Sequence, residues 1–202
     1  MRFCACSSLP LAILLGTAVN QDGRSSSLTA PNGPAQQAVL RMALTSGDCS
    51  PLRVTTLEMH GTGTPLGDPI EMGAAAAVLV SSSKARTLSH PSTMGAHSNE
   101  LPYHSCSLVL AAVKSAVGHG EPAAGVSGLA HTLLQSQQAA AQPILHLRGV
   151  NPHVGAIMKQ GHGARGWMAP RQLAGVPCTA PTPEHVAGIS AFAFQVEPNS
   201  VL

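Results

Sequence analysis

Two histidines and one lysine of this 202-residue chain stand in or beside short turns that contain glycine. His60 begins the stretch HGTGTPLGDPIE directly after an apolar run, and Lys114 and His119 bound the stretch KSAVGH. Imidazole titrates near neutral pH and can donate or accept a proton, so a histidine in a turn is a candidate for chemistry. The alternative for His60 is a core side chain satisfied by a backbone carbonyl. For Lys114 and His119 the alternatives are a solvated cation and an exposed turn residue.

The glycines that follow His60 raise the alternative of a nucleotide site. Gly61, Gly63 and Gly67 are spaced G-x-G-x-x-x-G, which misses the dinucleotide fingerprint by one residue. No acidic partner for a ribose is placed convincingly after them, and the sequence has no P-loop. The pattern therefore does not favour a nucleotide cradle.

Other reactive side chains fit no standard pattern. His97, His104 and Cys106 lie in a polar stretch, but their spacing matches no zinc motif. The serine runs at 25–27 and 81–83 are not in a G-x-S-x-G elbow. The five cysteines include no C-x-x-C pair, which favours a reducing compartment. We expect no metal site and no bound cofactor.

Composition limits the function classes. Apolar residues make up 44% of the chain, enough for one domain with a core, whereas charged residues make up 10% and the net charge is +2. We therefore expect no nucleic-acid partner. Arg2 and the apolar run from Leu9 to Val19 leave a signal peptide at 1–20 as an alternative, but that run is too short to span a bilayer, which needs about 20 residues. We expect no membrane span, and a cytoplasmic or plastid protein.

Apolar periodicity predicts alternating strands and helices. We expect strands over 11–19, 54–59, 108–114 and 185–194, and helices over 34–46, 68–80 and 125–135. Residues 81–107 read as a polar insertion, and residues 136–185 as a low-complexity stretch of loops. The alternation predicts an α/β layered fold with ligands beyond the strand ends, and His60 stands at such an end.

Three blocks of the sequence resemble the β-ketoacyl synthase family. They are GTAVNQDGRSSSLTAPNGPAQQAVLRMAL at 16–44, HGTGTPLGDPIEMGA at 60–74 and KSAVGHGEPAAGVSGL at 114–129, in the family's order. The ketosynthase domains of modular polyketide synthases are the most similar, and the blocks correspond to the carboxyl-terminal half of such a domain. Residues 14–202 then form this half-domain, and residues 1–13 are an N-terminal segment of uncertain role.

The resemblance implies a thiolase-like fold with αβαβα layers, of which this chain holds mostly the second half. It implies a decarboxylative Claisen condensation in polyketide or fatty acid biosynthesis, between acyl and malonyl thioesters. The substrates are carried on the phosphopantetheine of an acyl carrier protein. The expected partners are that carrier protein and either a second copy of the chain or a complementary ketosynthase half.

The family's site residues fall on particular positions of this chain. His60 and His119 match the two family histidines, and Lys114 matches a lysine whose charge would hold a neighbouring imidazole neutral. Donors aimed at the oxygen of the developing enolate would stabilise the transition state. Thr62 and Thr64 lie in a turn that approaches the substrate arm in the family. Phe194 falls in the carboxyl-terminal strand and loop, and we expect it beside the substrate.

The chain also departs from the family pattern. The stretch Ala5-Cys6-Ser7-Ser8 looks like the family's nucleophile elbow, but Cys6 lies only 54 residues before His60. The sequence leaves open whether it is a displaced nucleophile or a chance likeness. Ala116 replaces a usual asparagine, and Ala193-Phe194-Gln195 replaces a glycine-rich loop. Two alternatives therefore remain: a non-catalytic remnant or half-subunit that binds carrier protein, and a malonyl decarboxylase without condensation.

The stretch after the turn, Asp68-Pro69 to Glu71, reads as the start of a helix. We expect Asp68 to cap its exposed amides. These residues are therefore predicted to be structural.

Overall fold

The computed structural model describes most of the chain between residues 10 and 201. The described ranges are 10–23, 30–80, 108–138, 140–160, 167–168, 176–177, 186–193 and 199–201. The expected polar insertion at 81–107 lies outside them, as do Cys6 and Phe194.

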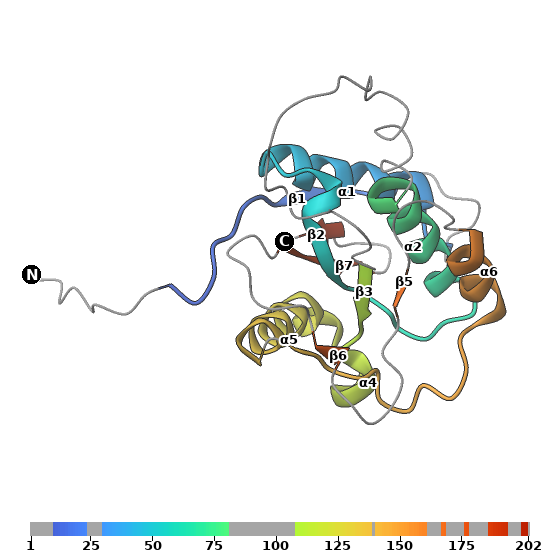
Figure 1. Ribbon diagram of the computed structural model, residues 1–202. Helices are drawn as coiled ribbons and strands as arrows, with labels where there is room; N and C mark the ends of the chain where they lie inside the picture. Colours follow the sequence, from blue (N-terminus) through green and yellow to red (C-terminus); the bar gives the residue numbers. More distant parts are fainter. Residues whose placement is uncertain are drawn as a thin grey trace, which may run out of the picture.

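A six-stranded sheet forms the centre of the molecule, with the strand order β1-β8-β7-β2-β3-β5 (Figure 1). Its strands are β1 (Ala18–Asn20), β2 (Val54–Glu58), β3 (Leu108–Ala111), β5 (Trp167–Met168), β7 (Val186–Ala191) and β8 (Asn199–Val201). Strand β2 pairs in parallel with β3 and β7, and β3 pairs in parallel with β5. Strand β8 runs antiparallel to β7 and β1. Strands β4 (Ala140–Ala141) and β6 (Val176–Pro177) form a separate antiparallel pair.

Helices cover the sheet from both sides. The α-helices are α1 (Gly33–Ser46), α2 (Gly67–Ala75), α4 (Lys114–Val117), α5 (Ala124–Gln138) and α6 (Pro152–Gln160). A π-helical turn, η2 (Ala76–Val80), continues α2, and two short 3₁₀ turns are η1 (Pro51–Arg53) and η3 (Glu121–Ala123). Helices α1 and α2 pack on each other on one side of the sheet, and α5 packs on β7 from the other side (Figure 1).

Helix α1 forms where the sequence predicts it. The Asn32 side chain accepts the backbone N–H of Ala35 at 3.1 Å, and a proline follows in the first turn. Val39 and Leu40 face the core, and the helix ends at Gly47. Local signals and apolar spacing agree here, so both ends of the helix are predicted correctly.

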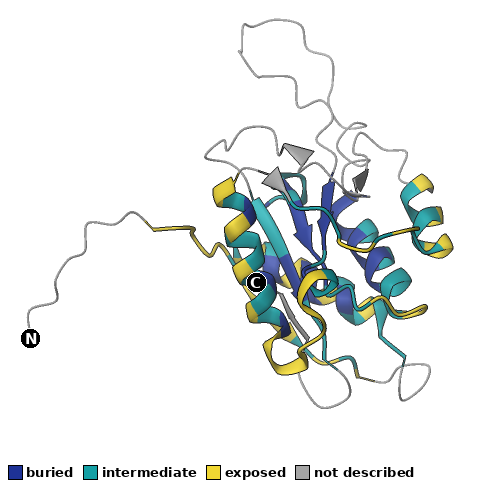
Figure 2. Ribbon diagram, turned by 90° about the horizontal axis from the view of Figure 1, so that it is seen from below, coloured by how far each residue is buried: buried dark blue, intermediate teal, exposed yellow. Residues whose placement is uncertain are grey.

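The core lies between the central strands and the inner faces of α1 and α2 (Figure 2). Its largest fully buried apolar side chains include Leu57 of β2, Leu108 of β3 and Met72 of α2. Burying a side chain of this size contributes roughly 1.5–3 kcal/mol. This core fixes the strands whose ends carry the site.

Most of the expected elements are confirmed, but the first strand is shorter than predicted. The strands at 54–59 and 185–194 and the helix at 68–80 are present within one to three residues of their expected ends. The expected strand over 11–19 is wrong except at its end, because pairing with β8 begins only at Ala18. Leu11 and Ile13 are 72% and 76% exposed, so their apolar character reflects a surface and not a buried strand.

Two helices were not predicted. Strand β3 ends at Ala111, three residues before the expected end, and Lys114 begins the short helix α4. The loops expected over 136–185 are interrupted by α6, in which Val154, Ile157 and Met158 pack against the core. Their helical spacing was present in the sequence, but the surrounding Gly, Ala and Pro residues obscured it.

Candidate functional site

The site lies at one edge of the sheet, near the carboxyl ends of three parallel strands. Glu58, the last residue of β2, is paired with Ala111 of β3 and Ile189 of β7. The residues that follow these strands therefore meet at one edge of the sheet. His60 follows β2, Lys114 follows β3 and Phe192 follows β7.

The structure brings His60 and His119 together. Their ring centroids lie 5.1 Å apart, with the ring planes at 87°. The backbone N–H of Phe192 donates to Nδ1 of His60 at 3.3 Å. The Phe192 ring packs edge-on against the His60 ring, with 5.8 Å between the ring centroids. Because Nδ1 is an acceptor in this arrangement, the neutral ring carries its proton on Nε2. His60 therefore presents an N–H donor from its other nitrogen.

Burial keeps His60 neutral. Loss of solvent, together with the smaller effects of the nearby charges of Lys114 and His119, lowers the pKa of His60 to about 3. A ring with this pKa is uncharged at physiological pH. It can donate a hydrogen bond to an anionic oxygen without first losing or gaining a proton.

Lys114 is half-buried and lies near enough to His60 to act on it electrostatically. Burial lowers its pKa below the ordinary value, and the negative charges of Glu71 and Glu58 act in the opposite direction. The buried carboxylates of Glu58 and Glu71 thus interact electrostatically with the Lys114 ammonium. Lys114 in turn lowers the pKa of His60, so the lysine and the imidazole are electrostatically coupled.

The turn that carries His60 is held by Glu71. One carboxylate oxygen accepts the backbone N–H of His60 at 2.7 Å, and the other accepts that of Gly61 at 2.9 Å. The Ser190 hydroxyl donates to the first oxygen at 2.7 Å. Burial raises the pKa of Glu71, and these three donors oppose the increase. Gly61 has a φ of +46°, a backbone angle that favours glycine.

The two threonines lie on the outer part of the same turn. Thr64 is exposed, and its hydroxyl accepts the backbone N–H of Gly67 at 3.0 Å. Thr62 is partly buried. The expectation that Asp68 caps helix α2 is wrong, since its carboxylate instead accepts the N–H of Gly63 at 3.1 Å, within the turn. Burial raises the pKa of Asp68.

Sequence reasoning missed three residues that shape the site. The sequence predicts Glu71 only as part of a helix start, whereas in the structure its carboxylate also anchors the histidine turn. Ser190 and Phe192 were not singled out at all. Only the position of Phe192 just beyond the last predicted strand was a usable signal, because strand ends meet at one edge of a parallel sheet.

Other reactive groups take no part in the geometry described. Within the described ranges, no group of three His, Cys, Asp or Glu side chains is placed to hold a metal ion. His97, His104, Cys106 and Phe194 lie outside those ranges. Cys49 is buried in the core.

Residues 11–148 match the family model described as the β-ketoacyl synthase C-terminal domain. The chain belongs to the β-ketoacyl synthase family. The match covers the three sequence blocks that carry the resemblance.

Curated relatives include large polyketide synthase proteins. The chain is 42% identical over 144 residues to the polyketide synthase GfsA of Streptomyces halstedii, covering 71% of this chain and 2% of that protein. It is 41% identical over 144 residues to the spectinabilin polyketide synthase system protein NorA' of Streptomyces orinoci, covering 71% of this chain and 3% of that protein. The chain thus spans only a small part of either relative. Both are bacterial proteins, which gives the expected plastid location no support.

Solved ketosynthase structures have the same fold. An oxazolomycin ketosynthase domain of Streptomyces albus matches with a TM-score of 0.70 and 31% identity, over 95% of this chain and 29% of that one. A ketosynthase from module 6 of the bacillaene synthase of Bacillus subtilis matches with a TM-score of 0.70 and 25% identity, over 93% and 29% of the two chains. The expectation of a thiolase-like α/β fold is confirmed. In the part of the chain that the structure describes, no helix combines the length and apolar character needed to cross a membrane.

Proposed function

We propose that this chain supplies the decarboxylating half of a β-ketoacyl synthase site, acting on a malonyl thioester. The observation that supports the proposal is the placement of the neutral His60. Its ring centroid lies 5.1 Å from that of His119, and its Nδ1 accepts the backbone N–H of Phe192. That arrangement leaves the Nε2–H of His60 as a donor beside a second imidazole. Two such donors can converge on a single thioester oxygen.

The reaction breaks the bond between the malonyl carboxylate and the adjacent carbon. Its electron pair forms the carbon–carbon double bond of an enolate, while the thioester π pair moves onto oxygen and carbon dioxide leaves. Donors fixed toward that oxygen bind it more tightly as charge develops, and removing one such donor costs about 10²–10³ in rate in enzymes that use them. The enolate carbon then attacks an acyl thioester in condensation, or takes up a proton in simple decarboxylation.

Lys114 would act on this reaction through its charge. Burial is the main reason that the pKa of His60 is low and the imidazole stays a neutral donor, and the Lys114 ammonium further opposes its protonation. A cation near the enolate oxygen also favours the transition state. Lys114 thus has a role that does not require direct contact with substrate.

We expect the malonyl group to arrive on the phosphopantetheine arm of an acyl carrier protein. The turn with Thr62 and Thr64 lies beside His60, with Thr64 exposed, and it can approach that arm. No further cofactor is required by the chemistry. Phe194, which lies outside the described residues, is expected near the substrate.

Condensation needs a thiol that carries the acyl chain. The described free cysteine, Cys49, is buried, so we propose that a complementary ketosynthase half, within a dimer or from a partner, supplies it. A groove of about 790 Å³ supports this assembly, since it is lined largely by apolar residues of 11–16, α1, α5 and β7. Exposed Val126 and Leu134 of α5 add to the apolar surface that such a half would cover.

The experiment is a decarboxylation assay with the purified chain and malonyl carrier protein labelled in the free carboxyl group. The proposal predicts release of labelled carbon dioxide that falls about 10²-fold or more in His60→Ala and His119→Ala. A folded chain that releases none, alone or with a ketosynthase half, indicates instead the non-catalytic half-subunit. Release without extension of an acyl chain, even when an acyl-loaded half is added, indicates a decarboxylase.

A further inference from the structure

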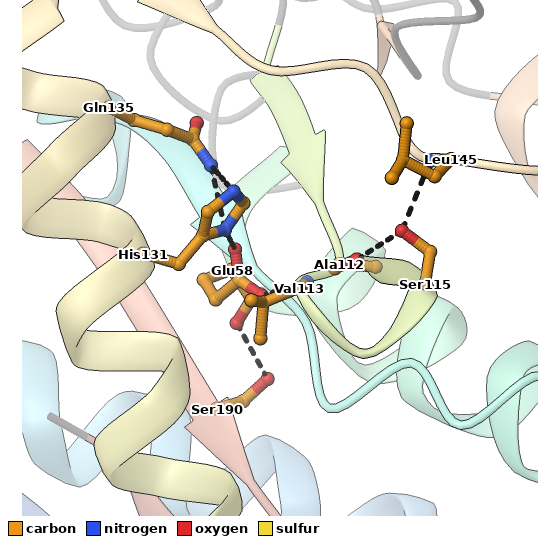
Figure 3. Close-up of polar contacts among 8 residues, drawn as sticks. All are labelled: Glu58, Ala112, Val113, Ser115, His131, Gln135, Leu145 and Ser190. Carbon is orange, nitrogen blue, oxygen red and sulfur yellow. Dashed lines mark hydrogen bonds and ion pairs between the residues drawn. The ribbon is translucent and has the colours of Figure 1, made fainter. Parts of the chain in front are cut away.

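A second buried carboxylate lies directly behind the site, on Glu58 at the end of β2. The Glu58 side chain is 1% exposed, and its two oxygens have different partners. One accepts the backbone N–H of Val113 at 2.7 Å, and the other lies 2.7 Å from Nδ1 of His131 (Figure 3). A buried carboxylate is costly unless such partners satisfy it, so both contacts are strongly required.

These contacts join three elements around the site. Glu58 belongs to β2, Val113 to the turn between β3 and α4, and His131 to α5. Val113 immediately precedes Lys114, and Glu58 lies two residues before His60. The Glu58 carboxylate therefore links strand β2, which leads to His60, with the turn that leads to Lys114.

Close packing places α5 within reach of this carboxylate. A Cβ at Gly128 would lie 3.3 Å from Cγ of Glu58 and 3.2 Å from Cγ2 of Ile189, so the glycine lets the helix approach β2 and β7. His131 follows one turn later on the same face. The side-chain nitrogen of Gln135 lies 2.9 and 3.0 Å from the two ring nitrogens of His131, which restricts the ring (Figure 3).

We propose that Glu58 is a positioning residue for the decarboxylation: by bonding the Val113 N–H while paired with His131, it fixes the turn that carries Lys114 relative to His60. The inference rests on the proposed function of those residues. Glu58 touches no substrate in this account, and it acts through the backbone of the turn. The length of the side chain should matter more for this role than its charge, because a neutral amide of the same length can keep the contacts with both Val113 and His131.

Two conservative variants separate reach from charge. Glu58→Gln keeps the length: its amide oxygen can accept from Val113, and its nitrogen can donate to Nδ1 of His131. Glu58→Asp keeps the charge but is one methylene shorter, so it cannot hold both partners. Asp48→Asn is the matched control, an exposed carboxylate changed to an amide at a φ of +44° that asparagine tolerates.

The experiment uses the full chain and two readouts that do not need activity. Hydrogen exchange follows the Val113 amide, and competitive labelling with an amine reagent follows the accessibility of Lys114. The proposal predicts that Glu58→Asp, which keeps the charge, speeds Val113 exchange by about tenfold or more and increases Lys114 labelling. In Glu58→Gln and the control, Val113 exchange should stay within about threefold of that in the unmodified chain. Faster exchange in Glu58→Gln, with Glu58→Asp unchanged, would overturn it.

The third readout is carbon dioxide release from malonyl carrier protein. We expect kcat to fall about tenfold or more in Glu58→Asp while KM changes less than about threefold, because substrate contacts are kept and geometry is lost. In Glu58→Gln, kcat should stay near the value of the unmodified chain. An inactive unmodified chain would refute the proposed function, but exchange and labelling would still decide the role of Glu58.

Discussion

The carboxylate of Glu71 accepts the backbone N–H of His60 at 2.7 Å and that of Gly61 at 2.9 Å. A side chain eleven residues along the sequence thereby fixes the backbone on which the candidate site is built. Hydrogen bonds to a charged acceptor are worth about 1.5–3 kcal/mol each, and two of them converge here in a buried place.

Replacement of Glu71 should loosen the histidine turn. Glu71→Ala leaves two part-buried backbone N–H groups and the Ser190 hydroxyl without this acceptor, and we expect the free energy of unfolding to fall by about 2–5 kcal/mol. Glu71→Gln keeps one accepting oxygen and should lose less. Urea unfolding measures both, with Asp48→Asn as the control for loss of a carboxylate. Equal stability of Glu71→Ala and the unmodified chain would contradict the anchoring role.

Gly61 should be less replaceable than Gly63 in the same turn. Both have a positive φ, +46° and +77°, so alanine is strained at either position by about 1–2 kcal/mol. At Gly61 an added Cβ would also lie 3.3 Å from Cβ of Ala112, whereas at Gly63 it meets nothing within 4 Å. We therefore expect Gly61→Ala to lower the urea midpoint more than Gly63→Ala. A reversed order would show that Ala112 yields without cost.

Burial is the main cause of the low pKa of His60, and the charge of Lys114 should lower that pKa further. Its positive charge lowers the pKa of that imidazole, so Lys114→Met should raise the pKa of His60 from about 3 toward the ordinary value. Lys114→Arg keeps the charge and is the matched control. Imidazole chemical shifts followed by NMR against pH measure this directly. An unchanged His60 titration in Lys114→Met would show that the charge of Lys114 does not contribute to the low pKa.

Acid should destabilise the chain partly through His60. Below pH 6.5 the unfolded chain protonates this histidine, but the folded chain does not until about pH 3. The free energy of unfolding then falls as pH drops through that window, by up to about 1.4 kcal/mol per pH unit for this one group. His60→Asn should lack this loss of stability. The free energy of unfolding of the unmodified chain should therefore fall relative to that of His60→Asn as the pH drops from about 6.5 to about 3. Parallel curves would mean that His60 is protonated alike in both states.

The sequence is sufficient for the elements whose local signals agree with their packing. Asn32 and the proline after it mark the start of α1, and the β-branched run before His60 marks β2. Helix α6 is not predicted although Asn151 and Pro152 mark its start, because the surrounding stretch is rich in Gly, Ala and Pro and resembles a loop. The side chain of Asn151 accepts the N–H of His153 at 2.9 Å, as a residue that caps a helix start does. An asparagine followed by a proline is therefore the sequence signal for the start of α6.

The candidate site was only partly predictable for a physical reason. The positions of His60, Lys114 and His119 follow from recognisable motifs, but the groups that hold them come from distant strands and helices. Phe192 reaches His60, and Ser190 reaches Glu71, only because β2 and β7 pair in parallel register, whereas Glu71 reaches the His60 turn from helix α2. Such contacts depend on the tertiary fold and leave no local pattern.

A double-mutant cycle on carbon dioxide release tests most directly whether His60 and His119 serve one oxygen. If both imidazoles donate to one oxygen, His60→Ala and His119→Ala should each slow the release of labelled carbon dioxide from malonyl carrier protein by about 10²-fold or more. The double variant should then be little slower than the slower single variant, because groups that act as a unit are not additive. Folded single variants that release carbon dioxide at the rate of the unmodified chain would contradict it.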